Sequence, residues 1–278
     1  MQSPDDLQNL DPAISIRSPI ATDGVAFLDR FGITDVMSSG TIQLFRSDRG
    51  LFSEVLRAAQ GSLPSTRERM LDMGCGYGAL SSLWGYSLGF KEIFGLDRDD
   101  KRMSIASRRG LKISHCDLGE DKFPFDDNYF DFATSFGVLD HIKILDNPIS
   151  EAHRVLKLGG CLAMSTTNLS SWVNRLALLL GYQPRNLEIS EKGLFGVHKL
   201  YKQLYTCTDA MGRISSFTLR ALEEFLNFNG FYILKRWGAG MIPSPDRDPG
   251  TLMKMIDRIL SKRPSLAVRY ILLAKKIR

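Results

Sequence analysis

The most constraining feature of the sequence is a set of three alternating glycines, Gly74, Gly76 and Gly78, between a strand-like and a helix-like segment. Glycine adopts positive φ angles and lets the backbone approach a ligand without a Cβ in between. The first N–H groups of the following helix can bind an anionic or carboxylate-bearing ligand. The next expected strand, Glu92–Leu96, is followed by Asp97, whose carboxylate can accept hydrogen bonds from both hydroxyls of a ribose. The junction therefore predicts a site for a nucleotide-type cofactor.

Two ligand classes fit this junction. The run from Gly74 to Ala79 satisfies the loose pattern G-x-G-x-x-A, so NAD is an alternative. Two details favour S-adenosylmethionine (SAM). The third glycine comes one residue earlier than in a dinucleotide fingerprint, and Asp72 precedes the glycines, where a carboxylate attracts the cationic amino group of a methionine moiety and repels a pyrophosphate. A glycine-rich turn without a ligand is a third, less favoured alternative, because the spacing of Asp97 supports a ligand.

Short apolar runs alternate with amphipathic segments from residue 69 onward, which predicts βαβ units around a parallel sheet. The expected strands are 69–73, 92–96, 112–115, 130–136, 161–166, 231–237 and 268–274. The expected helices are 79–88, 99–109, 147–156, 217–228 and 252–261, the one at 147–156 being stopped by Gly159–Gly160. We therefore expect an α/β fold with a doubly wound, mostly parallel, seven-stranded sheet.

The same pattern divides the chain into four parts. Residues 1–60 are expected to form an N-terminal helical extension, and residues 61–167 the cofactor-binding Rossmann-like core. The alternation breaks over 168–216, which predicts a helical insertion after the fifth strand that caps the substrate. Residues 217–278 complete the core with its last helix and strands.

Several segments resemble motifs of one family. LDMGCGYGAL resembles motif I of class I methyltransferases, and GLDRD at 95–99 resembles their motif II. FDFATSFGVLDHI at 130–142 is similar to the strand-four motif of small-molecule methyltransferases, and AHRVLKLGG at 152–160 to their RVLKPGG segment, with Leu158 in place of proline. The resemblance is strong over 67–167 and looser over 217–278. It implies a Rossmann-like, SAM-dependent methyltransferase of the small-molecule or type 11-like subgroup, with strand order 3-2-1-4-5-7-6 and an antiparallel last strand.

The resemblance also implies which residues bind SAM and its product S-adenosylhomocysteine. These are Asp72, Gly74, Cys75, Gly76, Gly78, Asp97, Arg98, Asp117, Leu118, Ser135 and Phe136. The glycine loop with Asp72 would contact the methionine part, Asp97 the ribose, and Arg98 with Asp117 and Leu118 the adenine. The last two positions, at the end of strand four, would line the sulfonium side. A plain turn role is the alternative for Asp97 and Asp117.

Methyl transfer from a sulfonium needs alignment above all, but an oxygen or carbon nucleophile gains from a general base that titrates near neutrality. His141 is the first candidate, because it follows strand four at the edge of the sheet where doubly wound folds bind ligands. Capping or packing of the next helix is its alternative role. Asp140 stands where the family usually has Glu. His198 is a second candidate, whereas His115 and His153 are expected to be structural.

The insertion is expected to line the acceptor pocket or to act as a lid. Its aromatic side chains could form the walls: Trp172, Tyr182, Phe195, Tyr201 and Tyr205. Residues 174–184 resemble a stretch found in methyltransferases of cell-envelope and polysaccharide gene clusters. We therefore expect a small-molecule or lipid- or sugar-linked envelope precursor as the acceptor. A hairpin that only covers apolar surface is the alternative.

The net positive charge of the chain is compatible with partners other than a small-molecule acceptor. The net charge of +5 and the pI near 9.0 allow RNA, a protein or an anionic membrane surface. Nucleic acid is disfavoured because strand four ends in Ser135–Val138, without the N/D-P-P-Y/F signature that holds a flipped base. The basic segments 254–262 and 275–278 could contact a membrane, although a solvated helix and tail is the favoured interpretation. A non-catalytic SAM-binding partner protein is a further alternative.

The spacing of the cysteines and the composition of the first residues indicate where in the cell the protein is expected. The four cysteines, Cys75, Cys116, Cys161 and Cys207, are widely spaced without a CxxC pair, so neither a metal site nor a disulfide framework is expected. Residues 1–12 are polar and acidic, so no signal peptide is expected, and the apolar stretches are too short to span a bilayer. We expect a cytoplasmic protein.

Overall fold

The computed structural model describes residues 49–199, 212–241 and 250–278 of the chain. The expectations for the N-terminal extension up to residue 48, and for Tyr201, Tyr205 and Cys207, lie outside the described residues. The basic residues at 254–262 and 275–278 lie inside them.

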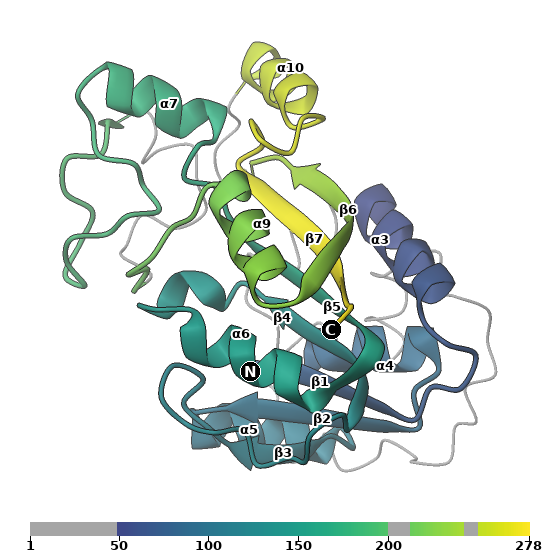
Figure 1. Ribbon diagram of the computed structural model, residues 1–278. Coiled ribbons are helices and arrows are strands. Elements are labelled where there is room, and N and C mark those ends of the chain that lie inside the picture. Colours follow the sequence, from purple (N-terminus) through teal and green to yellow (C-terminus); the bar gives the residue numbers. More distant parts are fainter. Residues whose placement is uncertain (1–48, 200–211, 242–249) are drawn as a thin grey trace, which may run out of the picture.

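The described strands form one seven-stranded sheet in the order β3-β2-β1-β4-β5-β7-β6 (Figure 1). They are β1 Arg69–Met73, β2 Glu92–Asp97, β3 Lys112–His115, β4 Phe130–Phe136, β5 Leu156–Thr167, β6 Phe231–Ala239 and β7 Arg269–Lys276. Strands β1 to β5 pair in parallel, and β7 runs antiparallel to both β5 and β6. The expected fold class and strand order are confirmed.

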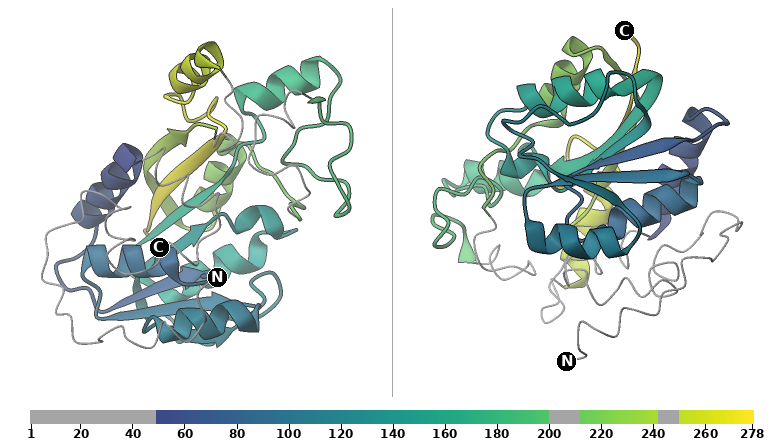
Figure 2. Two further views of the ribbon diagram at one scale, coloured as in Figure 1. Left: turned by 180° about the vertical axis from the view of Figure 1, so that it is seen from behind. Right: turned by 90° about the horizontal axis from the view of Figure 1, so that it is seen from below.

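Helices cover both faces of this sheet. They are α3 Arg49–Ser62, α4 Ala79–Leu88, α5 Asp100–Arg108, η3 Leu139–His141, α6 Asp146–Val155, α7 Trp172–Leu179, α9 Leu219–Phe228 and α10 Thr251–Leu260. Helices α6 and α9 lie in front of the sheet in Figure 1, and α3 and α4 lie behind it, as the reverse view in Figure 2 shows. Each face thus has its own apolar layer.

Alternation along the central strands sorts side chains between these layers. On β5, Leu162 and Met164 pack with residues of α6 and α9, whereas Ala163 packs with residues of α3 and α4. On β7, Leu272 packs on the side of α6 and α9, and Leu273 packs on the side of α3 and α4. All five side chains are fully buried. Burial on both faces explains why these strands are continuous apolar runs in the sequence.

The glycine pair Gly159–Gly160 lies within β5 and does not end the preceding helix as expected. Helix α6 ends at Val155, and the chain continues directly as strand from Leu156. Phe130 pairs with Leu156 and Phe132 with Cys161, so β5 carries extra residues opposite β4. Gly160 lies in this bulge, where a Cβ would come within 2.9 Å of the Lys157 carbonyl oxygen. The pair therefore serves a β-bulge and is not a helix stop.

Helix α9 and the insertion also differ in detail from the expectation. Helix α9 begins at Leu219, with Thr218 as its N-cap accepting the Ala221 N–H at 3.1 Å. Phe217, expected in the helix, instead bridges to Asn168. In the described part of the insertion, α7 is followed by turns and irregular backbone over 180–198, so the expectation of a helical insertion holds for α7 alone there.

The topology places the loops that matter at one edge of the sheet. The loops after β1, β2, β3 and β4 leave the carboxyl ends of parallel strands, which lie at a common edge. Thr167, at the end of β5, pairs with Arg269 at the start of β7, and Ala239 at the end of β6 pairs with the same residue. Helices α7 and α10 therefore lie at this edge too.

Candidate cofactor site

The three glycines of the loop after β1 all adopt positive φ angles, of 79°, 52° and 77°. A Cβ on Gly74 would lie 2.4 Å from a methyl of Val138, and one on Gly78 would lie 3.0 Å from the Cβ of Ala106. A Cβ on Gly76 would meet nothing within 4 Å. The outer glycines are therefore required by packing, whereas Gly76 faces open space that a ligand can fill.

The loop is held by the neighbouring strand β2. The N–H groups of Gly74 and Cys75 donate to the Leu96 carbonyl at 2.8 and 3.0 Å. The Gly76 N–H donates to Asp97 Oδ2 at 2.8 Å, and Asp97 Oδ1 accepts the Asp99 N–H at 3.0 Å. Asp97 therefore lies beside the glycine loop as the sequence predicts. It also fixes that loop, and a carboxylate with two such bonds keeps acceptor capacity for a ribose.

Asp72 is buried beneath this loop, with 3% of its surface exposed. Its Oδ2 accepts the Ser81 hydroxyl at 2.5 Å and its Oδ1 the Thr134 hydroxyl at 2.7 Å. Burial raises the pKa of this carboxyl to about 6, and Asp97 adds to the rise by charge repulsion. Among the described residues no Lys or Arg forms an ion pair with it. A bound ammonium group would supply that missing charge.

The residues assigned to adenine lie at the ends of β2 and β3. Arg98 Nη1 lies 3.6 Å from Asp117 Oδ2, and Asp117 Oδ1 accepts the Gly119 N–H at 2.9 Å. The structure thus brings this predicted pair together. The side chain of Leu118 is buried in the core on the α6 side of the sheet, so any contact with adenine would use its backbone.

The side chains at three further predicted cofactor positions, Cys75, Phe136 and Ser135, are in different environments. The Cys75 side chain packs against Ala106 and Leu111, and burial raises the pKa of its thiol, so this residue can offer backbone atoms only. The Phe136 ring stacks on Trp84 with centroids 5.2 Å apart. Ser135 is fully buried, and its Oγ has no hydrogen-bond partner among the described residues. Direct cofactor contact remains a prediction for all of them.

The candidate base lies in η3, directly after β4. His141 Nδ1 lies 3.0 Å from the carbonyl oxygen of Gly212 in the insertion. Because a carbonyl only accepts, Nδ1 carries the proton, and the neutral ring has its lone pair on Nε2. The structure thus fixes the tautomer that a general base at Nε2 requires.

A clamp from the insertion holds η3 in place. Asp140, 2% exposed, pairs with Arg213 through Oδ2 and Nε at 2.9 Å, and its carbonyl accepts the N–H groups of Ile214 and Ser215. Glu188 Oε2 accepts the N–H groups of Gly212 and Arg213 at 2.8 and 3.1 Å. The carbonyl that orients His141 is therefore itself held by Glu188.

Sequence reasoning missed the partners that do this holding. Arg213 is 73 residues from Asp140, and no local pattern joins them. Ser81 and Thr134 were also missed, although a buried acid after an apolar strand signals a need for nearby donors. His198 lies on an exposed part of the insertion with its ring 4.7 Å from that of Tyr182, measured between centroids.

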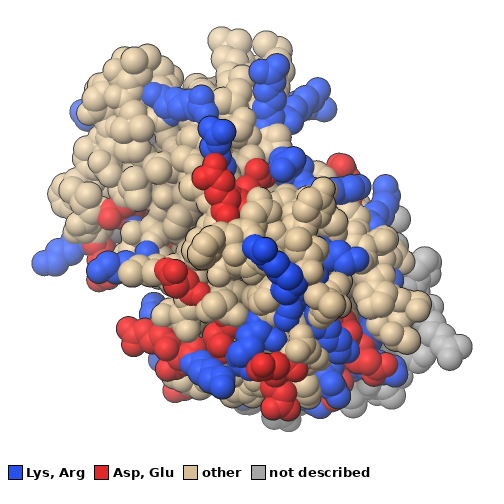
Figure 3. All heavy atoms as spheres, viewed as in Figure 1, with Lys and Arg blue, Asp and Glu red and all other residues tan. Residues whose placement is uncertain are grey.

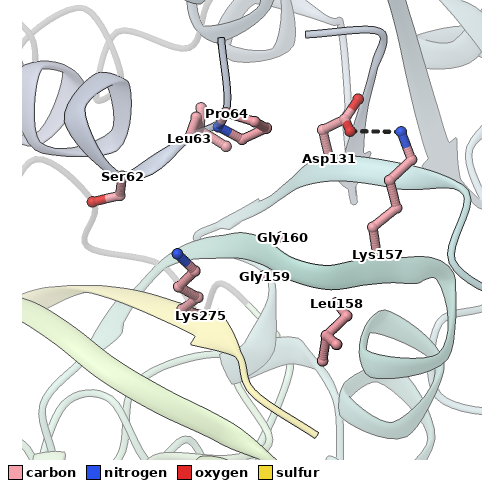
Figure 4. A pocket seen from close by; sticks show the side chains of 9 residues that line it. All are labelled: Ser62, Leu63, Pro64, Asp131, Lys157, Leu158, Gly159, Gly160 and Lys275. Carbon is pink, nitrogen blue, oxygen red and sulfur yellow. Dashed lines mark hydrogen bonds and ion pairs between the residues drawn. The ribbon is translucent and has the colours of Figure 1, made fainter. Parts of the chain in front are cut away.

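A pocket of about 380 Å³ lies at the other edge of the sheet, at the amino ends of β4 and β5 (Figure 4). Its wall includes Lys157, which pairs with Asp131 at 2.6 Å, and Lys275. Asp131 also accepts the N–H groups of Glu68 and Arg69. This ion pair ties the start of β1 to β4 and β5, so the pocket is separate from the predicted cofactor site.

None of the described helices combines the length and the apolar character needed to cross a bilayer.

Comparison with known proteins agrees with this geometry. Residues 71–164 match the methyltransferase domain family of type 11, a segment that contains every predicted cofactor residue. A demethylmenaquinone methyltransferase of Chlorobaculum tepidum is 33% identical over 107 residues, which is 38% of this chain and 43% of that protein. A ubiquinone/menaquinone biosynthesis C-methyltransferase of Nitrosospira multiformis is 31% identical over 137 residues, 46% of this chain and 51% of that protein.

The chain spans about half the length of the curated relatives that it matches. The fold is also found in a crystal structure of a SAM-dependent methyltransferase from Archaeoglobus fulgidus, with a TM-score of 0.51 at 17% identity over 82% of this chain and 94% of that one. The sheet order, the glycine loop and the spaced acids define a Rossmann-like nucleotide-binding domain. Within this domain, residues 71–164 are similar to the class I methyltransferases of type 11, whose cofactor is SAM.

Proposed function

We propose that this chain transfers a methyl group from SAM to a small-molecule or cell-envelope-precursor acceptor at the carboxyl edge of its sheet. The observation that carries the proposal is the unit formed by Gly76, Asp97 and Asp72. It combines an open glycine position, a carboxylate at ribose spacing and a buried carboxylate that lacks a counter-charge. When bound, SAM supplies an electrophilic methyl group on a sulfonium.

The residues around this unit bind and orient. Asp72 would pair with the amino group of the methionine part, which is the charge that its buried carboxylate lacks. Asp97 would bind the ribose while keeping the glycine loop closed. Arg98 and Asp117 would border the adenine. These contacts fix the cofactor, and alignment is the main requirement of an in-line displacement.

His141 would act as the general base through Nε2. The support is its fixed tautomer and its place directly after β4, at the edge where the cofactor loops gather. Glu188 would be a positioning residue, since it holds the Gly212 backbone that orients the ring. The alternative, that His141 caps the following helix, is not supported, because the N-cap of α6 is Leu145 and no side chain of the described residues caps it.

A small-molecule acceptor is favoured over RNA or protein. The two relatives described above are named for menaquinone or ubiquinone biosynthesis. On the face drawn in Figure 3, basic and acidic side chains are interspersed over the core, which is unlike the continuous basic stripe that tracks a nucleic acid backbone.

Methyl-labelled SAM offered with separate acceptor pools tests the proposal. The pools are a phenol or quinol series, lipid-linked sugars, RNA, and peptides. We expect label in one of the first two, and a decrease in kcat of about 100-fold for His141→Gln, with SAM affinity unchanged. His115→Gln, at the end of β3, is the matched control. Label in RNA or peptide alone would contradict the acceptor class, and SAM binding without transfer to any pool would favour a non-catalytic binding protein.

A further inference from the structure

Helices α7 and α10 form one end of the molecule (Figures 1 and 2). They come from distant parts of the sequence but meet through Asp257 of α10, whose Oδ1 accepts the indole N–H of Trp172, the first residue of α7, at 2.9 Å. Both follow strand ends at the carboxyl edge of the sheet, where the cofactor loops lie. The surface that they form therefore lies at the same edge of the sheet as the proposed site.

Helix α10 exposes one stripe of its apolar residues, whereas its other apolar residues, Met253, Ile256 and Leu260, are half-buried. Its one acidic residue, Asp257, is buried and also accepts the Met241 N–H at 2.7 Å. Leu252, Met255 and Ile259 follow each other at spacings of three and four and are 67%, 53% and 57% exposed. A helix on a soluble core normally buries such a stripe and exposes its acids. In α10, by contrast, the acid is buried and this stripe is exposed on the described part of the surface.

Helix α7 likewise buries a polar residue beside Val173 and exposes most of its leucines. Its polar Asn174 is buried and donates to the Asn168 carbonyl and to Asn186 Oδ1, at 3.0 and 2.6 Å. Outward lie four leucines that continue past the end of the helix, at positions 176, 178, 179 and 180. Leu179 is 82% exposed. Exposed apolar side chains gathered on two adjoining helices mark an interaction surface, whereas isolated ones do not.

The exposed charges on these two helices are positive. Lys254, Arg258 and Lys262 follow at intervals of four along one side of the apolar stripe of α10, and Arg175 lies on α7. Within the two helices, Asp257 is the only acid, and it is buried. Figure 3 shows blue Lys and Arg side chains set in tan surface at this end of the molecule. Outward apolar residues beside a row of Lys and Arg are typical of helices that lie in the interface of an anionic bilayer.

We propose that the α7–α10 surface, defined by the exposed apolar residues of these two helices and the basic residues beside them, binds the surface of an anionic phospholipid membrane. Its leucine, methionine and isoleucine side chains insert at the acyl boundary, and its Lys and Arg side chains contact lipid phosphates. The surface would also let the enzyme take a lipid-borne acceptor directly from the bilayer. This last statement, unlike the membrane binding itself, rests on the proposed function.

Co-sedimentation of the full chain with vesicles tests the proposal. One vesicle set contains phosphatidylcholine alone, and the other contains phosphatidylcholine with phosphatidylserine. We expect binding to the second set that weakens several-fold between low and 0.5 M salt. The double variants Leu178→Ser/Leu179→Ser and Met255→Ser/Ile259→Ser should each lower the partition coefficient by about tenfold or more. Arg258→Glu/Lys262→Glu should do the same.

Matched controls distinguish binding through this surface from nonspecific adsorption of the chain to vesicles. Phe228→Ser removes a strongly exposed apolar side chain at the end of α9, away from the α7–α10 surface. Arg108→Glu reverses a charge at the end of α5. Both should bind vesicles as the unchanged chain does. Equal loss in the controls, or no binding of the unchanged chain to anionic vesicles, would overturn the proposal. So would self-association that the surface variants abolish in light scattering without any vesicle binding.

SAM calorimetry on the same samples keeps the two proposals apart. The surface variants should bind SAM as the unchanged chain does, since none of them touches the glycine loop. Vesicle binding by a chain that does not bind SAM would leave the membrane surface standing and overturn the proposed function. SAM binding by a chain that does not bind vesicles would overturn the membrane surface and leave the proposed function standing.

Discussion

The carboxylate of Asp97 accepts the backbone N–H of Gly76 at 2.8 Å, so that the acid at the end of one strand holds the glycine loop at the end of its neighbour. The loop and the acid are therefore one unit, although Gly76 and Asp97 are 21 residues apart in the chain. The predictions below follow from this unit and from the contacts around it.

The inner and outer glycines should respond differently to alanine. Gly76→Ala should cost only about 1 kcal/mol of stability, from its positive φ, but should weaken SAM binding by tenfold or more because the new Cβ enters ligand space. Gly74→Ala should cost about 2–4 kcal/mol because its Cβ collides with Val138. Urea unfolding and calorimetry measure both effects. If Val138→Ala fails to restore stability to Gly74→Ala, the packing explanation is wrong.

The buried carboxyl of Asp72 should make stability and binding depend on pH in opposite directions. Its pKa is raised from 3.8 to about 6 in the folded state, so its contribution to folding is fully present below about pH 4 and is lost as pH rises through 6. That loss is about 3 kcal/mol in the free energy of unfolding. SAM binding should instead strengthen from pH 5 to 7, because the ionised carboxylate attracts the cofactor's amino group.

Asp72→Asn isolates this group. The variant should be more stable than the unchanged chain at pH 7, equally stable near pH 4, and weaker in SAM binding. Denaturant unfolding at the two pH values and calorimetry at pH 7 provide the readouts. A variant that loses stability at pH 7 would show that Asp72 is already compensated in the folded protein.

The insertion clamp should set the protonation site of His141. In ¹⁵N-histidine NMR spectra, with the signals assigned by His141→Gln, the neutral ring should be protonated at Nδ1. Glu188→Ala should shift the ring towards a mixture of tautomers and lower kcat by about tenfold while leaving SAM affinity unchanged. Glu188→Gln keeps an accepting oxygen and should retain most of the activity. Unaltered ring shifts in Glu188→Ala would show that Glu188 has no part in positioning His141.

Lys276 should be the most costly lysine to remove from the sheet. It is 7% exposed, and its Nζ donates to Asn128 Oδ1 and to the carbonyls of His153 and Leu156 at the end of α6. Lys276→Met leaves buried carbonyls without donors and should lower stability by about 2–4 kcal/mol. Lys275→Met, at the neighbouring half-buried position, where the side chain makes no such bonds to buried carbonyls of the described residues, should change it by less than about 0.5 kcal/mol. Equal effects in thermal unfolding would mean that these three bonds contribute little.

The parts of the fold and site that local pattern encodes were predictable. The alternation of apolar runs placed β1, β3 and β4 at their observed bounds, and the spacing of Asp97 from the glycines placed both at the same edge. Parallel strands buried on both faces leave a strong signal of this kind. The family resemblance supplied the strand order.

The parts that depend on contacts between distant residues were not predictable. The Asp140–Arg213 pair spans a stretch of chain without a repeating pattern, so neither residue identifies the other. The bulge at Gly160 depends on the approach of Lys157 and Asp131 backbone atoms, which sequence does not show. The outward apolar faces of α7 and α10 have the periodicity of ordinary core helices, and only the buried Asn174 and Asp257 reveal their orientation.

The central claim is most directly tested by calorimetry with the full chain. SAM, S-adenosylhomocysteine and NADH are titrated into the unchanged chain, Asp97→Ala and Asp97→Asn. We expect micromolar binding of both SAM species, no binding of NADH, loss of about 100-fold or more in Asp97→Ala, and a smaller loss in Asp97→Asn, which keeps one accepting oxygen. Failure of the folded, unchanged chain to bind either SAM species would contradict the account.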